Sequence, residues 1–392
     1  MSLSTVRGIT WNHSRAFPPL IATAQRFGEL HPAIEVTWEK RSLHEFGHAS
    51  LANLCAQYDL IIVDHPMMGE AHRDNLLLDL KPLLKPEVLT EMAEDSLGES
   101  YRSYLLEDHL YALPIDAAAP AASSRTDLMA RFDIAVPGSW EQMLSLARRG
   151  LVRMPGFPAD LFLNFVGMCL SQGAVLARSS EELLDREIAL SCFELLHELA
   201  SYMPAEIFNW NPITLYEEMV ATDDFVYCPF AYTYSNYSRP GFAKHNLRFG
   251  SSPPLPSRVP MRTVLGGTGI ALSRLCKQQE PALAFAEYVQ SATCQGSLYG
   301  QAGGQPARRS AWADPTLNAI SGDFFSHTLA SIDLAYVRPR YAGYIPFQEQ
   351  AGVPLAEYIQ VHRGGGSRQA AQQALDRVDK LYRSSFWGPR ND

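Results

Sequence analysis

The stretch YDLIIVDHP, residues 58–66, is a continuous apolar run of strand length that ends in polar side chains. Upstream of it, strand-like and helix-like segments alternate: VRGITW (6–11), FPPLIATAQRFGEL (17–30), AIEVTWEK (33–40) and EFGHASLANLCAQ (45–57). Alternation of this kind predicts βαβ units, and a fully apolar strand predicts a parallel sheet that is covered by helices. The first hundred residues therefore predict an α/β fold.

Polar and aromatic side chains stand where the first and third predicted strands end. Trp11 and His13 follow the first strand, and Asp64 and His65 follow the third. Ligands of parallel α/β sheets bind beyond the carboxyl ends of the strands. We therefore predict that these four residues contribute to a ligand site.

Length and charge exclude some classes of protein. A chain of 392 residues is expected to form two domains, because a single hydrophobic core stops growing near about 250–300 residues. The net charge of −9 argues against a nucleic-acid partner, which requires a basic face. No apolar run approaches the roughly 20 residues of a membrane span, and no secretion signal is visible at the start of this sequence.

The six cysteines are widely spaced and form no CxxC pair, so they indicate neither a zinc ribbon nor a disulfide scaffold. We expect most of them to be buried free thiols. A disulfide between Cys169 and Cys192 stays open as an alternative, although no local pattern enforces it.

HEFGH, residues 44–48, matches the zinc-protease pattern H-E-x-x-H. On a helix it would supply His44 and His48 as ligands and Glu45 as general base, with Glu70 as the third ligand. A glycine inside the motif weakens such a helix by about 1 kcal/mol, and the strand at 58–66 separates the motif from Glu70. A zinc metallopeptidase is therefore the alternative interpretation, and we expect only the start of a surface helix here.

A dense aromatic segment, DDFVYCPFAYTYSNYSR, spans residues 223–239. In a regular strand Phe230, Tyr232 and Tyr234 would share one face. Such rings stack on the apolar face of a sugar while their hydroxyls form hydrogen bonds, and Asn236 adds a neutral hydrogen-bonding group. Ordinary core packing is the alternative explanation for the same face.

Four segments in this order resemble the extracellular solute-binding proteins of ABC importers, family 1, of the carbohydrate type. They are LYALPIDAAAPAASSRTDLMARFDIAVPGSWEQMLSLA (110–147), DDFVYCPFAYTYSNYSR (223–239), LGGTGIALSR (265–274) and PALAFAEYVQSATCQGSLYGQAGGQPARRSAW (281–312). The resemblance extends over roughly residues 7–385. Within the first segment, Ser139 is a predicted helix N-cap, with Gln142 completing a capping box.

The resemblance implies a type II periplasmic-binding fold, in which two α/β lobes surround a ligand cleft. Lobe 1 would comprise residues 1–115 plus 266–325, and lobe 2 residues 116–265 plus 326–392. The chain would cross between the lobes near residues 115–117 and 265–269. These crossings make Asp116, Gly267 and Thr268 candidate ligand contacts.

The resemblance also implies a function. The chain would bind a small polar solute, with a sugar or sugar-like molecule as the favoured class, and deliver it to the permease of an ABC transporter. We expect no catalytic residue, no metal, no cofactor, a monomer, and a location in the periplasm or at the extracellular face. Besides the metallopeptidase, a cytoplasmic solute sensor is the remaining alternative.

Overall fold

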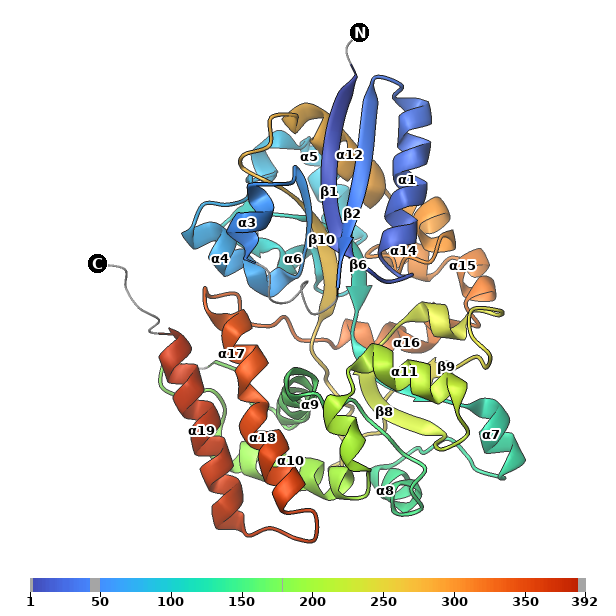
Figure 1. The fold of residues 1–392 in the computed structure, drawn as a ribbon, viewed down its shortest axis with the longest axis vertical. Coiled ribbons are helices and arrows are strands. Elements are labelled where there is room, and N and C mark those ends of the chain that lie inside the picture. The colour runs from blue at the N-terminus through green and yellow to red at the C-terminus, as the bar shows by residue number, and fades with distance from the viewer. Residues whose placement is uncertain (1–2, 43–49, 178, 387–392) are drawn as a thin grey trace.

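The computed structural model describes residues 3–42, 50–177 and 179–386. Figure 1 shows two lobes, one above the other, with the N-terminal strands in the upper lobe and the C-terminal helices in the lower lobe. Several segments of the chain run between the lobes. None of the described helices is long and apolar enough to cross a membrane.

A five-stranded sheet with the order β2-β1-β3-β10-β6 forms the first lobe. β1 (Ser4–Trp11) lies between β2 (Ile34–Arg41) and β3 (Leu60–Val63), and both pair with it in parallel. The parallel arrangement predicted for these three strands is confirmed. β10 (Gly266–Leu272) comes from much later in the chain and inserts antiparallel between β3 and β6 (Leu113–Ala118).

Helices cover this first sheet. α1 (Phe17–Leu30) has the predicted bounds, and its buried Leu20, Ala24 and Phe27 recur at the spacing of one helical face. α12 (Gln279–Gln290) packs against β1, β6 and β10. The other elements around this lobe are α3 (Leu51–Cys55), α4 (Met68–Arg73), α5 (Pro86–Glu94), α6 (Ser100–Ser103), β4 (Leu105–Leu106), β5 (His109–Leu110) and α13 (Ala292–Cys294).

A three-stranded antiparallel sheet with the order β8-β7-β9 belongs to the second lobe. Its strands are β7 (Pro120–Ser124), β8 (Tyr227–Tyr232) and β9 (Arg248–Gly250). The helices of this lobe are α7 (Thr126–Arg131), α8 (Trp140–Arg148), α9 (Pro158–Ser171), α10 (Arg186–Ser201), α11 (Pro212–Ala221), α17 (Tyr344–Ala351), α18 (Val353–Val361) and α19 (Arg368–Phe386).

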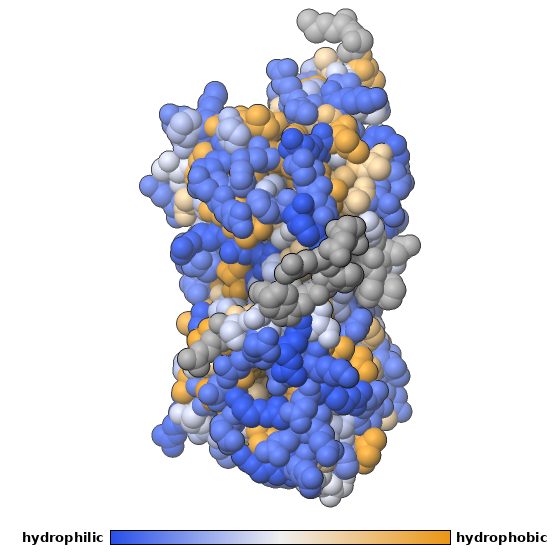
Figure 2. Space-filling model, turned by 90° about the vertical axis from the view of Figure 1, so that its left-hand side faces the viewer, coloured by the Kyte–Doolittle hydropathy of each residue, from blue (hydrophilic) through white to orange (hydrophobic). Residues whose placement is uncertain are grey.

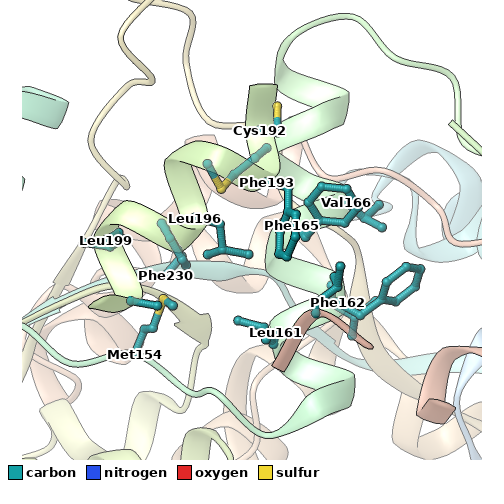
Figure 3. Close-up of a cluster of buried hydrophobic side chains, with 14 of the residues drawn as sticks. Met154, Leu161, Phe162, Phe165, Val166, Cys192, Phe193, Leu196, Leu199 and Phe230 are labelled. Carbon is teal, nitrogen blue, oxygen red and sulfur yellow. The ribbon is translucent and has the colours of Figure 1, made fainter. Parts of the chain in front are cut away.

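α9 is the central helix of the second lobe. It is buried nearly all round, as expected for a helix that is apolar on every face. Phe162 and Phe165 of α9 meet Phe193 and Leu196 of α10 in one hydrophobic cluster (Figure 3). This packing fixes the start of α9, which faces the first lobe.

The helix α8 begins with the N-cap that the sequence predicts. Ser139 is the N-cap, and its Oγ accepts a hydrogen bond from the backbone N–H of Gln142 at 3.2 Å. The return bond of the predicted capping box is shifted by one residue, because Gln142 Oε1 accepts from the N–H of Gly138 at 2.8 Å.

A third hydrophobic cluster joins the aromatic strand region to α14 (Arg309–Trp312), α15 (Pro315–Ile320) and α16 (Phe324–Asp333). α16 packs on β7 and β9, which belong to the second sheet. The predicted assignment of residues 266–325 to lobe 1 and 326–392 to lobe 2 stays a prediction, and this cluster spans its boundary.

Two further features complete the fold. All six cysteines are free and buried, including Cys169 on α9 and Cys192 on α10. Figure 2 shows the face that carries α19, where polar residues dominate and the hydrophobic ones lie in small separate patches.

Candidate functional site

A cavity of about 320 Å³ lies between the lobes, within the range of small-molecule sites. Strand ends of the first lobe line one side, and the start of α9 and the end of β8 line the other. Its principal lining residues are Trp11, Arg15, Asp64, Phe157, Asp160, Asn209, Asn211, Tyr232, Tyr234, Gly267, Thr268, Arg338, Gln348 and Glu349.

The structure brings part of the predicted ligand-binding set together at this cavity. Trp11, Asp64, Tyr232, Tyr234, Gly267 and Thr268 line it. The other candidates, His13, His65, Asp116, Phe230 and Asn236, stand behind the lining or in the core. The ligand-binding role of the whole set stays a prediction.

Arg15 and Asp116 form a buried ion pair behind the cavity wall. Arg15 Nε donates to Asp116 Oδ2 at 2.8 Å, and Arg15 Nη2 donates to the other carboxylate oxygen. Burial opposes the charge of Arg15, but the Asp116 carboxylate outweighs it and raises the pKa of Arg15. Asp116 is therefore already engaged and supports the wall from behind.

The same arginine connects the two lobes. Arg15 Nη1 donates to the carbonyl oxygen of Thr233 at 2.9 Å, directly after β8. Its guanidinium lies 4.9 Å from the centroid of the Tyr234 ring, within cation–π range. Arg15 thus links the loop after β1 to the aromatic segment of the second lobe.

His13 supports Tyr234 at the edge of the cavity. The two rings meet edge to face with centroids 4.7 Å apart, and His13 Nδ1 accepts from the backbone N–H of Arg15 at 2.9 Å. Burial, together with the charge of Arg15, lowers the pKa of His13 to about 4. His13 is therefore neutral at pH 7.

A second ion pair joins the half-buried Asp64 to the buried Arg338, in the segment between α16 and α17. Arg338 Nη2 donates to both Asp64 oxygens, at 2.7 and 2.6 Å, and Nη1 donates to Gln348 Oε1 at 3.1 Å. Burial alone would raise the pKa of Asp64, but Arg338 lowers it to about 2. This pair fastens the returning segment to the first sheet.

His65 contacts both members of this pair. Its Nε2 accepts from the backbone N–H of Arg338 at 3.2 Å, while its Nδ1 lies 3.2 Å from Asp64 Oδ1. Burial, with the charge of Arg338, lowers the pKa of His65 to about 4, so the ring is neutral at pH 7. His65 positions Asp64 and Arg338 and does not line the cavity.

The aromatic segment reaches the cavity only at its end. β8 ends at Tyr232, and Tyr234 lies beyond the strand. Phe230, within the strand, packs in the core of the second lobe. Tyr232 Oη donates to the Leu265 carbonyl at 3.4 Å. Asn236 is buried in the following turn and does not line the cavity.

Gly267 and Thr268 line the cavity near the start of β10, where the chain enters the first sheet. Gly267 has φ +106°, and a Cβ at this position would lie 2.2 Å from the carbonyl oxygen of Asp116. Only glycine fits this close approach of the two crossing strands. Thr268 is 4% exposed, and its Oγ1 has no hydrogen-bond partner among the described residues.

Several lining residues escaped prediction. Arg15 and Arg338 act through partners far away in the sequence, and Asp160 stands in the first turn of α9. The proline at the first position of α9 marks a helix start. That signal indicates a helix N-terminus, but nothing local indicates that it faces a cavity.

A larger hollow of about 1030 Å³ lies beside residues 333–342 and shares Arg338 with the cavity. None of the sequence-predicted ligand contacts lines it. We therefore assign the candidate site to the smaller cavity.

The zinc-site alternative gains no support. His44, Glu45 and His48 lie outside the described residues. Glu70 lies in α4, where burial and nearby Asp74 raise its pKa. Among the described residues, no group of three or more His, Cys, Asp or Glu side chains is placed to hold a metal ion.

Solved structures with the same fold cover nearly the whole chain. The maltose-bound MalE3 of T. maritima has a TM-score of 0.79 at 17% identity, over 96% of this chain and 100% of its own. The solute-binding protein of Agrobacterium radiobacter K84 in complex with ribitol has a TM-score of 0.78 at 18% identity, over 98% and 99%. A solute-binding protein of Thermotoga lettingae bound with α-D-tagatose has a TM-score of 0.78 at 15% identity, over 97% and 100%.

These likenesses show the type II periplasmic-binding fold with two α/β lobes, as predicted. No curated protein sequence matches the chain. Residues 10–175 match the family model described as bacterial extracellular solute-binding protein, whose members are non-enzymatic transport components. This match covers less than half of the chain, and over these residues the chain is similar to the bacterial extracellular solute-binding proteins.

Proposed function

We propose that the chain binds a small polar solute, a sugar or sugar-like molecule, in the cavity between its lobes and delivers it to the permease of an ABC transporter. The observation that carries this proposal is the cavity itself, where Trp11 and Tyr232 offer rings and Thr268 offers a hydroxyl. Aromatic rings combined with convergent polar groups suit a sugar, which has apolar faces and many hydroxyls. The fold neighbours described as bound to maltose, ribitol and tagatose support the same class of solute.

Binding and release require no chemistry on the solute, so no residue is given a catalytic role. The family is extracellular or periplasmic. We place the chain in the periplasm or at the outer face of the membrane, and we propose that it acts as a monomer, with the permease as its macromolecular partner.

A thermal-shift screen of sugars, polyols, amino sugars and sugar acids tests the solute class. A solute that binds only the folded state stabilises it by about 2.7 kcal/mol at a hundredfold excess over Kd. We expect hits among the sugars or polyols, including their amino derivatives. A screen in which only unrelated solutes such as peptides or metal ions bind would contradict the proposal.

Calorimetric titration of the best hit then tests the place of binding. Trp11→Ala and Tyr232→Ala should each weaken binding at least about tenfold, because a stacked ring contributes on the order of 1 kcal/mol beyond its buried area. Tyr202→Ala is the matched control, since Tyr202 is exposed on the second lobe and away from the cavity. Normal binding by both cavity variants would refute this placement.

A further inference from the structure

The arginines that line the cavity are already neutralised inside the protein. Arg15 is bound by Asp116, and Arg338 by Asp64, each through two hydrogen bonds to one carboxylate. Breaking a buried pair of this kind leaves an uncompensated charge, which is strongly unfavourable. These arginines are therefore poorly suited to bind an acidic solute.

Asp160 differs from these paired groups. It lines the cavity from the first turn of α9, where it is half-buried, and its carboxylate makes no hydrogen bond or ion pair with another described residue. Burial, together with the charge of Glu349 on α17, raises the pKa of Asp160 to about 8. A negative charge at this place is therefore costly until a cation or a donor reaches it.

The hydroxyl of Thr268, in the same cavity, also lacks a hydrogen-bond partner among the described residues. Thr268 lines the opposite side from β10 and is 4% exposed. Buried polar groups in proteins are almost always paired, so an unpaired one at a cavity indicates a missing ligand or water. A carboxylate accepts hydrogen bonds only, and a hydroxyl both accepts and donates.

We propose that the solute carries a protonated amino group, as an amino sugar or an amino polyol does, and that this group pairs with Asp160. An ammonium group is a donor only, so it matches the carboxylate of Asp160 and the acceptor side of Thr268. The faces of Trp11 and Tyr232 are electron-rich and attract a cation as well. This inference rests on the proposed function and narrows its class of solute.

Two matched pairs of probes test the inference by calorimetric titration at pH 7: glucosamine with glucose, and glucamine with glucitol. Within each pair an amino group replaces one hydroxyl. We expect at least one amine to bind about tenfold or more tightly than its hydroxyl partner, because hydrogen bonds to charged groups are worth roughly twice neutral ones. Asp160→Asn should remove most of this preference, and Asp224→Asn, which neutralises an exposed carboxylate of the same lobe, should keep it.

Proton release gives a readout besides affinity. Pairing with an ammonium group favours the ionised form of Asp160, so binding of the amine should release a proton in the wild type. Titrations in two buffers of different ionisation enthalpy measure this release, and Asp160→Asn should abolish it. The other charged groups that line the cavity are Glu349 on α17, Arg15, Asp64 and Arg338, and Asp116 lies behind the wall, paired with Arg15.

The possible results separate the two proposals. Equal binding of amine and hydroxyl partners, or an amine preference that survives Asp160→Asn, would overturn this inference and leave the proposed function intact. If neither pair binds and the wider screen yields only neutral sugars, the inference also fails alone. If the wider screen yields no carbohydrate or polyol of any kind, both proposals fail.

Discussion

Replacing Arg338 by methionine tests the most heavily engaged side chain of the cavity wall. The change removes both hydrogen bonds to Asp64 and the donors to Leu265 and Gln348. Removing one partner of a buried ion pair costs about 3–5 kcal/mol, because the remaining charge stays buried without compensation. Because Asp64 is 19% exposed at the cavity, we expect Arg338→Met to lower the free energy of unfolding by about 3 kcal/mol, the lower end of this range, in urea titrations followed by fluorescence and circular dichroism.

A double-mutant cycle isolates the pair itself. Asp64→Asn in the Arg338→Met background removes the stranded charge, so the double variant should be less destabilised than the sum of the two single variants. Arg148→Met is the control, because its pair with Glu198 is exposed and should contribute about 0.2–1 kcal/mol. If Arg338→Met costs no more than Arg148→Met, the reasoning about the buried pair is refuted.

The pH dependence of the pair has a definite sign. Arg338 lowers the pKa of Asp64 from 3.8 to about 2. A lowered carboxyl pKa contributes stability that is complete above pH 4 and is lost as the pH falls through about 2, here about 2 kcal/mol. The wild type should lose this stability in acid, and Asp64→Asn should lose correspondingly less.

Three further predictions concern single positions. Gly267→Ala should lower the free energy of unfolding by about 1–3 kcal/mol in urea, since φ is positive and the new Cβ would meet the Asp116 carbonyl; Gly296→Ala, with open space around it, should cost much less. Ser139→Ala should cost about 1 kcal/mol in thermal unfolding by removing the N-cap of α8, and Ser139→Asp should largely keep it; equal losses would contradict the capping role. Because the pKa of Asp160 is raised to about 8, the solute-free protein should lose stability as the pH rises from about 4 to about 8. Thermal unfolding measured across this pH range should show a smaller loss of stability for Asp160→Asn than for the wild type. An equal loss in the two proteins would contradict the prediction.

The sequence was most informative where local pattern and fold agree. Alternating apolar segments predicted β1, α1, β2 and β3, because burial on a sheet or along one helix face imposes a period that is visible in the chain. The rule for strand ends led to Trp11 and Asp64, which do line the cavity.

The remaining features depend on contacts between distant parts of the chain. Arg15 and Asp116 are separated by 101 positions, and Arg338 and Asp64 by 274, so no local pattern announces either pair. The alternation of Phe230, Tyr232 and Tyr234 along one strand face predicts Phe230 as a ligand contact. Phe230 packs in the core instead, because β8 reaches the cavity only at its last residue.

The location of the solute tests the central claim most directly. A crystal structure of the protein with the tightest hit of the thermal-shift screen would show it. We predict density for the solute in the 320 Å³ cavity, in contact with Trp11 from the first lobe and Tyr232 from the second. Density in the larger hollow beside residues 333–342, with this cavity holding only water, would contradict it.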